Sequence, residues 1–270
     1  MPEASYPQST ERSVSPKTFQ VGERQKIVCM HIPKIAGMAM RYYLSAQYPS
    51  HQVCPITGWA ELLGREDVLR SYHLVQGHFG YNVRSLVADD TRTLIILRDP
   101  IMRTISLLKH LQRDPEFHPD YSLATGLNLN EMIQNPMLMG SQSNVQTRFL
   151  CASKDPTEIR TYLSSGLLQN LSAGPGDVED PPSLELAIQR LEAIDFIGLT
   201  ETLGADISRI AEDMSYHMPR HFPVINEDPF QNHDRLVLSE GELETLREHN
   251  SLDIQIYEFA KKLIERRSIT

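Results

Sequence analysis

Four short apolar runs limit the fold of this chain more than any other feature of its sequence. They span Gln25–Ile32, His73–Gln76, Thr93–Leu97 and Asp195–Leu199, and their Val, Ile and Leu residues are typical of buried β-strands. The segments between them carry apolar residues at helical spacing, most clearly from Ala36 to Gln47. Because strands that alternate with helices form parallel βαβ units, we expect an α/β fold with a central parallel sheet flanked by helices. Such sheets bind ligands at the carboxyl ends of their strands.

Several residue pairs mark where helices should begin. Asp99–Pro100 follows the third apolar run directly, and this pair is suited to the N-cap and the first turn of a helix. Asp155–Pro156 repeats the pattern. Ser239–Glu242 has the spacing of a capping box, so we expect an amphipathic helix to close the chain. The buried stripe of that helix should consist of Leu252, Ile256, Phe259 and Leu263.

The chain is long enough for one domain with a full hydrophobic core. It has 270 residues, of which 40% are hydrophobic, so we expect a single domain over residues 25–270. Residues 1–24 are rich in Pro, Ser, Thr and Glu and contain no apolar run, which is typical of a disordered tail. No stretch approaches the roughly 18 apolar residues that span a bilayer, and the N-terminus lacks a signal-peptide pattern. We therefore expect a cytoplasmic protein that does not enter a membrane.

Charge and cysteine content argue against further classes of protein. The formal net charge of −9 disfavours nucleic-acid binding, which needs a concentrated basic face, so an anionic ligand requires a local cationic pocket. Cys29, Cys54 and Cys151 are too scattered for a disulfide framework, and none lies at zinc-ligand spacing to a histidine. We expect reduced thiols and no metal site. Nothing in the sequence indicates an oligomeric state.

The loop after the first predicted strand has features of an anion-binding turn. It reads His31-Ile32-Pro33-Lys34-Ile35-Ala36-Gly37-Met38. Backbone N–H groups at the start of the following helix favour an anion, and Lys34 adds a full positive charge. Gly37 would let the backbone approach a ligand closely. The G-x-x-x-x-G-K-[ST] pattern of magnesium-dependent ATP and GTP sites is absent. Taken alone, the loop also fits an ordinary turn with a surface lysine.

A second candidate anion site follows the third predicted strand. Arg98 stands at the end of this strand, and Ser106 lies on the helix that follows. An arginine supplies a fork of N–H donors and a serine supplies a hydroxyl, so the two side chains suit one phosphate group. Taken alone, Arg98 could equally cap the strand while Ser106 lies on a solvated helix face.

The two segments together resemble motifs of the sulfotransferases that use 3′-phosphoadenosine 5′-phosphosulfate (PAPS), particularly the branch with bacterial members and the uronyl 2-O-sulfotransferases. His31–Gly37 is similar to the phosphosulfate loop H-x-P-K-T-A-G-T-S, and Leu97–Ser106 to the 3′-phosphate motif L-R-D-P-x-x-R-x-x-S. Less specific signatures follow in the family's order at Asn144–Leu150, Phe196–Glu201 and Asp253–Ala260. The resemblance extends from about Lys26 to Leu263 and implies a P-loop-type three-layer sandwich.

The resemblance also implies how the donor is bound. Lys34 would contact the oxygen that bridges phosphate and sulfate, and Arg98 with Ser106 would hold the 3′-phosphate. The 5′-phosphosulfate loop would comprise Pro33, Lys34, Ile35, Ala36, Gly37, Met38 and Ala39. Sulfuryl transfer resembles phosphoryl transfer, so positioning and neutralisation of the leaving oxygen supply most of the catalysis. Lys34 would provide that neutralisation without a metal.

Three positions of the first loop differ from the family pattern. Its two Thr and one Ser are here Ile35, Met38 and Ala39, so three hydroxyl donors are missing. Each hydrogen bond to a charged phosphate is worth roughly 1.5–3 kcal/mol. A non-catalytic nucleotide-binding relative is therefore an alternative hypothesis, and a P-loop phosphotransferase or kinase is another. The kinase is disfavoured because no Ser or Thr follows Lys34 to hold magnesium.

A histidine is the expected general base for a hydroxyl acceptor. His78 follows the second predicted strand, and the uronyl branch resembled here carries its catalytic histidine after the same strand; alternatively, His78 only hydrogen-bonds a loop. His110, on the helix after Pro100, is the second candidate base. Glu201 is a weaker candidate for contact with the acceptor or the base.

The acceptor should be a small molecule, a secondary metabolite or a carbohydrate, with a hydroxyl or amine to be sulfated. The long, turn-rich segment of residues 113–136 is interpreted as a lid over the acceptor pocket, and its His118 and Tyr121 as candidate substrate contacts.

Overall fold

The computed structural model describes residues 24–35, 37–113, 121–164, 182–218 and 238–268. In these residues a parallel sheet has four strands in the order β2-β1-β3-β4. The strands are β1 (Ile27–Met30), β2 (Leu74–Gly77), β3 (Arg92–Leu97) and β4 (Phe196–Leu199). They coincide with the four apolar runs of the sequence. The order places the loop after β1 between the ends of β2 and β3, where the ends of the strands form one edge.

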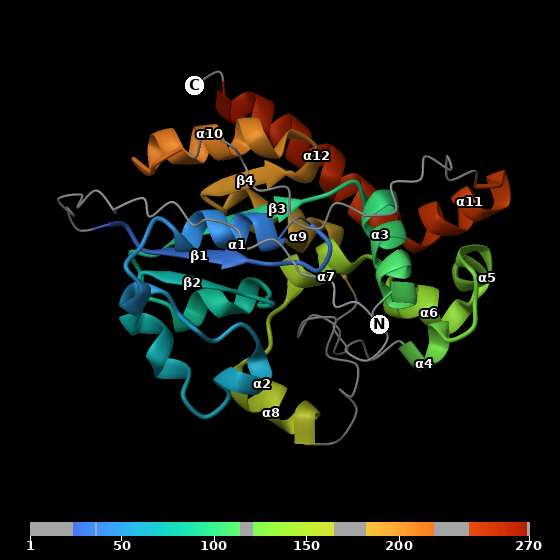
Figure 1. The fold of residues 1–270 in the computed structure, drawn as a ribbon, viewed down its shortest axis with the longest axis horizontal. Helices are drawn as coiled ribbons and strands as arrows, with labels where there is room; N and C mark the ends of the chain where they lie inside the picture. Colours follow the sequence, from blue (N-terminus) through green and yellow to red (C-terminus); the bar gives the residue numbers. More distant parts are fainter. Residues whose placement is uncertain (1–23, 36, 114–120, 165–181, 219–237, 269–270) are drawn as a thin grey trace, which may run out of the picture.

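Helices cover both faces of the sheet, so the predicted three-layer α/β architecture is confirmed (Figure 1). One face packs against α1 (Gly37–Ser45) and α10 (Leu203–Asp213). The other face carries α7 (Val145–Cys151), α9 (Leu184–Glu192) and α12 (Ser251–Ser268). All four strands are buried along almost their whole length, which is the pattern of a parallel sheet enclosed between helices.

A second apolar core lies beside the sheet among five helices. These are α3 (Pro100–Arg113), α4 (Tyr121–Ala124), α5 (Leu129–Gln134), α6 (Pro136–Ser141) and α11 (Glu240–His249). Fully buried Leu108, Leu111, Ile133 and Leu138 meet there. The described part of the segment predicted to be a lid therefore contains α4 and α5, which pack into this second core.

The predicted helix starts are confirmed by their hydrogen bonds. The Asp99 carboxylate accepts the backbone N–H of Met102 at 2.9 Å at the start of α3. Asp155 caps α8 (Pro156–Ser164) in the same way, and Ser239 with Glu242 forms a complete capping box at α11. One closing helix was expected. The structure has α11 and α12 instead, because buried Asn250 ends α11 by bonding the carbonyl of Leu246.

Short elements complete the described chain. They are α2 (Trp59–Leu62) and the 3₁₀ turns Ser50–Gln52, Glu66–Ser71, Tyr81–Leu86 and Thr200–Thr202. In the described ranges, no helix combines the length and the apolar character needed to span a membrane. Residues 1–23 of the predicted tail lie outside the described residues.

Candidate active site at the carboxyl ends of the strands

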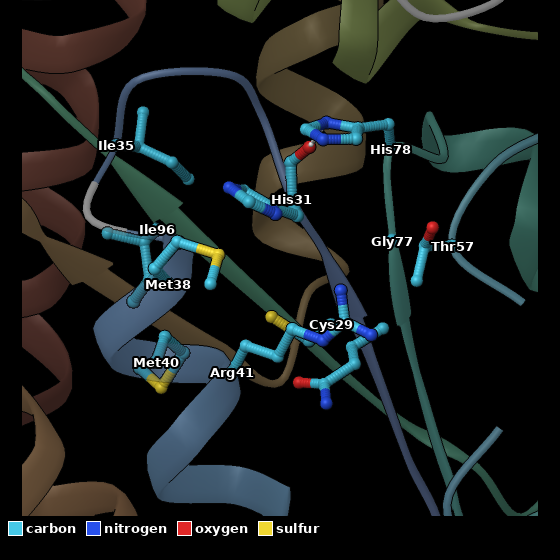
Figure 2. A pocket seen from close by; sticks show the side chains of 12 residues that line it. Cys29, His31, Ile35, Met38, Met40, Arg41, Thr57, Gly77, His78 and Ile96 are labelled. Carbon is cyan, nitrogen blue, oxygen red and sulfur yellow. Dashed lines mark hydrogen bonds between the residues drawn. The ribbon is translucent and has the colours of Figure 1, made fainter. Parts of the chain in front are cut away.

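A cavity of about 80 Å³ lies at the carboxyl ends of β1 and β2, beside the start of α1 (Figure 2). The sheet contributes Cys29 and Gln76, the loop after β1 contributes His31 and Ile35, and α1 contributes Met38, Met40 and Arg41. His78 and Thr57 line the side next to β2. The cavity thus adjoins the loop that was predicted to bind the phosphosulfate group, and it includes the histidine predicted to be the general base.

His31 and His78 form a stacked pair in this cavity. Their ring centroids are 4.5 Å apart with an interplanar angle of 26°. The backbone fixes both residues, because the N–H of His31 bonds the carbonyl of Gly77 at 2.8 Å and the N–H of His78 bonds that of Thr57 at 2.7 Å. His78 Nδ1 lies 3.0 Å from the carbonyl oxygen of His31. Figure 2 shows the ring of His78 next to His31. A carbonyl only accepts, so Nδ1 carries the proton of the neutral ring and Nε2 keeps the lone pair.

Both imidazoles are neutral at physiological pH. Burial, together with the electrostatic effects of His78, Arg41 and Lys34, lowers the pKa of His31 from 6.5 to about 3. His78 is solvent-exposed, but nearby protein atoms still desolvate its ring and lower its pKa. Arg41 also lowers the pKa of His78, whereas the hydrogen bond to the His31 carbonyl raises it. A neutral His78 is the form that can accept a proton.

The loop between β1 and α1 is tightly constrained. Lys34 has a left-handed backbone conformation with φ of 72°, which is uncommon for a residue with a side chain and costs of order 1 kcal/mol. A Cβ at Gly37 would overlap the imidazole of His31, so a larger residue at this position would require the His31 ring to move. Sequence reasoning assigned Gly37 to close approach of a ligand. Within the described residues, the group in close approach is His31.

The residues that replace the family's hydroxyls have different surroundings. Ile35 is only 2% exposed and packs into the main hydrophobic core while it also lines the cavity. Ala39 is buried, whereas Met38 is 40% exposed. Ala36 lies outside the described residues. The loop is therefore held by apolar packing on its inner side, where the family pattern has hydroxyl groups.

Arg98 connects the second predicted anion site to the first. Its Nη1 donates to the carbonyl of Lys34 at 2.9 Å, and its other N–H groups make no hydrogen bond to the described residues. Burial lowers the pKa of the guanidinium, while the nearby charges of Glu201 and Asp99 raise it, and an arginine remains protonated throughout. Arg98 thus fixes the loop after β1 from the end of β3 and retains donors for an anion.

Gln146 and Asp253 hold the backbone of Arg98 in place. The Gln146 amide accepts the N–H of Arg98 and donates to its carbonyl, both at 2.9 Å. The Asp253 carboxylate in turn accepts the N–H groups of Gln146 at 3.0 Å and Thr147 at 2.7 Å, together with the Thr147 hydroxyl. Gln146 and Asp253 are both almost completely buried. Two of the weaker sequence signatures therefore meet at one point behind Arg98.

Glu201 contributes the third signature to the same corner. Its carboxylate accepts the N–H of Asp99 at 3.0 Å and the hydroxyl of Tyr257 at 2.8 Å. Burial and the charge of Glu201 raise the pKa of the Tyr257 hydroxyl. The described contacts of Glu201 thus lie at the Arg98 corner, and a contact with substrate stays a prediction.

Other predicted site residues lie apart from the cavity. Ser106 is half-buried in the second turn of α3, the helix that follows Arg98. Its hydrogen bond to a 3′-phosphate stays a prediction. His110 lies further along α3 and does not line the cavity. Tyr121 begins α4, and His118 lies outside the described residues.

The comparison with protein-family models decides the family. The model of the sulfotransferase family matches residues 17–260. The chain belongs to this family. No curated protein sequence matches the chain. Family membership and the parallel sheet with its helices agree, and they support sulfuryl-group transfer as the general class of activity.

Four residues of the cavity and of the Arg98 corner were not predicted from the sequence. Two of them, His31 and Gln146, stand within the family motifs, but the motifs do not show which side chains they contact in the fold. Gln76 is a polar residue in an otherwise apolar strand, and Arg41 is the cation in the largely apolar helix α1. A polar residue inside a buried strand is a usable signal, because such a side chain needs a partner.

Proposed function

We propose that the chain transfers a sulfuryl group from PAPS to a hydroxyl or amine of a small-molecule, secondary-metabolite or carbohydrate acceptor. The observation that carries this proposal is the geometry of His78 in a chain of the sulfotransferase family. His78 lines the cavity next to the loop after β1, and its bond to the His31 carbonyl leaves Nε2 with a lone pair. A base in that position and tautomer can accept the proton of an acceptor.

The described residues fit a bisphosphorylated donor. The N-terminus of α1 offers partial positive charge to the 5′-phosphosulfate, and Lys34 adds a full charge. Arg98 has donors for the 3′-phosphate. Pro33 and the residues to Ala39 would surround the 5′-phosphosulfate, and Ser106 would add a hydroxyl to the 3′-phosphate. These assignments support PAPS as the donor in preference to a nucleotide without a 3′-phosphate.

The transfer itself is a displacement at sulfur. The acceptor oxygen forms a bond to sulfur while its proton passes to His78 Nε2. The bond from sulfur to the 5′-phosphate oxygen breaks, and that oxygen keeps the electron pair. Lys34 neutralises the charge on the leaving oxygen, so that 3′-phosphoadenosine 5′-phosphate (PAP) departs as product. The charge requirement of each step is thus met by a residue of this chain.

Calorimetric titration tests the proposal. PAP should bind at least about 10-fold more tightly than either adenosine 5′-phosphate or ATP, because Arg98 serves the 3′-phosphate. EDTA should leave both binding and turnover unchanged. Turnover of PAPS is then measured with a panel of hydroxyl and amine acceptors. Tight binding of PAP without turnover of any acceptor would favour the non-catalytic relative, and magnesium-dependent binding of ATP would favour the kinase.

Substitution of His78 tests the assignment of the base. His78→Ala should lower kcat by about 10²-fold or more, since general bases contribute roughly 10²–10⁴-fold. The affinity for PAP should change less than about 2-fold, because the base contacts the acceptor. In the wild type, the acid limb of the rate profile should lie below pH 6.5, since the pKa of His78 is lowered, and this limb should vanish in the variant. His51→Ala, at an exposed histidine, is the matched control. Near-normal kcat in His78→Ala would leave His110 as the next candidate.

A further inference from the structure

Arg41 is a cation at the cavity with no ion-pair partner among the described residues. It lies in the second turn of α1, lines the cavity, and makes no hydrogen bond or salt bridge there. Figure 2 shows its side chain extending from α1 toward the strands, below His31. Its positive charge acts on both imidazoles and lowers their pKa values. An arginine directed into a cavity beside two neutral histidines is suited to an anionic ligand group.

Gln76 provides a second, independent sign of a ligand. Its side chain is only 4% exposed and lines the same cavity. Its Nε2 donates to the Ser45 hydroxyl at 2.7 Å, whereas its Oε1 is buried without a hydrogen-bond partner. Buried polar atoms are nearly always hydrogen-bonded in native proteins. A ligand with a hydroxyl or an N–H group in the cavity would supply the missing donor.

The other residues that line the cavity limit the charge and the size of a ligand that can bind there. None of the described lining residues is acidic, and most of the others are apolar or uncharged, such as Cys29, Met40 and Ile96. An ammonium group would therefore meet only Arg41 and two imidazoles. A volume of about 80 Å³ suits one small polar group of a ligand, together with a few carbon atoms.

We propose that this cavity binds the carboxylate of the acceptor, so that the preferred acceptors are hydroxy acids. The carboxylate pairs with Arg41, and a hydroxyl or N–H group of the same acceptor donates to Gln76 Oε1. This inference rests on the proposed function, and it adds the class of acceptor. The carboxylate would hold the acceptor beside His78, where the neutral imidazole faces the same cavity.

Arg41 lies beyond Ala39 in α1 and is not among the residues proposed to hold the donor's phosphates. The N-terminus of α1, Lys34 and Arg98 form the proposed donor site at the ends of β1 and β3. Arg41 lines the cavity together with Gln76, Gly77 and His78 on the β2 side. Ile35, Gly37 and Met38 of the proposed donor loop line the same cavity, so the acceptor would lie next to the sulfuryl group of the donor. Loss of Arg41 should therefore alter recognition of the acceptor and leave recognition of PAP intact.

The test is an NMR titration of the full chain with lactate and with lactamide. Both probes carry a hydroxyl, and they differ in the negative charge of the carboxylate. The ring signals of His31 and His78 report binding in the cavity, with and without saturating PAP, at constant pH and ionic strength. We expect lactate to bind at least about 10-fold more tightly than lactamide, in keeping with a charge-assisted hydrogen bond. Arg41→Gln should abolish this preference, and Arg41→Lys should keep part of it.

Controls make each outcome decisive. Arg70→Gln removes the same charge at an exposed position outside the cavity and should retain the preference for lactate. The proposal is overturned if the wild type binds both probes equally or if the preference survives in Arg41→Gln. A 10-fold loss of PAP affinity in Arg41→Gln would also overturn it, because Arg41 would then belong to the donor site. If the wild type does not bind PAP, the sulfotransferase proposal fails, while the titration without nucleotide still decides the carboxylate site.

Discussion

The candidate site has two parts, the Arg98 corner at the end of β3 and the β1 corner at the end of β1, and different interactions stabilise them. At the end of β3, the Arg98 backbone is held by Gln146 and its neighbour Asp99 by Glu201, through hydrogen bonds of 2.9–3.0 Å. At the end of β1, the loop is shaped by apolar packing of Ile35, by the left-handed Lys34 and by the ring of His31 against Gly37. A side-chain hydrogen bond from Arg98 to the Lys34 carbonyl connects the two corners.

Because of this difference, we expect the two corners to have different roles in binding and in transfer. A polar network with satisfied hydrogen bonds gives one rigid geometry, which suits recognition of a phosphate by a guanidinium fork. The loop after β1 is instead fixed by apolar packing and by its backbone conformation, and it relies on its backbone N–H groups for an anion. We therefore expect the Arg98 corner to supply most of the affinity for PAP, and the β1 corner to supply the groups that act in transfer.

The largest effect should follow removal of the Arg98 side chain. Arg98→Ala should weaken PAP binding by about 10²–10⁴-fold, since two charge-assisted hydrogen bonds are lost at roughly 1.5–3 kcal/mol each. Binding of adenosine 5′-phosphate should change far less. Calorimetry measures both ligands, and Arg70→Ala is the control for loss of an exposed arginine. Equal losses for the two nucleotides would remove Arg98 from the 3′-phosphate.

The next effect concerns the residue behind Arg98. Gln146→Ala should weaken PAP binding by about 10-fold and destabilise the fold by about 1–3 kcal/mol, because a buried N–H and carbonyl lose their partners. Adenosine 5′-phosphate binding should change little.

Gln47 offers a matched control for that substitution. It is another buried glutamine that bonds both the N–H and the carbonyl of one residue, His217, but it does not line the cavity. Gln47→Ala should cost similar stability in urea unfolding and leave PAP binding unchanged. Equal effects of the two variants on PAP would show that Gln146 acts only through stability.

Ile35 tests the apolar character of the β1 corner. A threonine at this position, as in the family pattern, would add a hydroxyl to the loop, but Ile35 is 2% exposed within the core. The substitution should therefore destabilise the fold by roughly 1–3 kcal/mol, through lost packing and a buried hydroxyl, without increasing affinity for PAP. Ile35→Val, measured beside it by urea unfolding and calorimetry, separates volume from polarity. Tighter PAP binding in the Thr variant alone would mean that the hydroxyl reaches the donor.

The smallest expected effect concerns His31. It changes the free energy of unfolding in acid and leaves it nearly unchanged at neutral pH. Its pKa is about 3 in the folded chain and 6.5 in its ordinary state. Between these values the unfolded chain binds a proton that the folded chain does not, so stability falls as the pH decreases from 6.5 toward 3. His31→Gln should flatten the free energy of unfolding against pH in this range, measured by urea titration. The control His51→Gln should show the same dependence of the free energy of unfolding on pH as the wild type. If His31→Gln also shows that dependence, the lowered pKa of His31 is contradicted.

Local sequence determined the elements of this protein. Short β-branched runs became β1 to β4 because burial on both faces of a parallel sheet requires continuous apolar segments. Asp99 and Asp155 began their helices as expected, since an N-cap acts on N–H groups only two or three residues away. The division of the closing helix at Asn250 was missed, because the pattern of apolar residues continues through the break.

The sequence by itself also determined the order of the family signatures and the candidate roles of Lys34, His78 and Arg98. Only the tertiary structure brought Gln146, Asp253 and Glu201 together behind Arg98, across about 50 to 150 positions of the chain. It likewise stacked His31 on His78 and brought Arg41 and Gln76 into the lining of one cavity. The physical reason is that hydrogen bonds and stacking depend on distances of a few ångströms, which the crossovers between parallel strands set and local spacing does not.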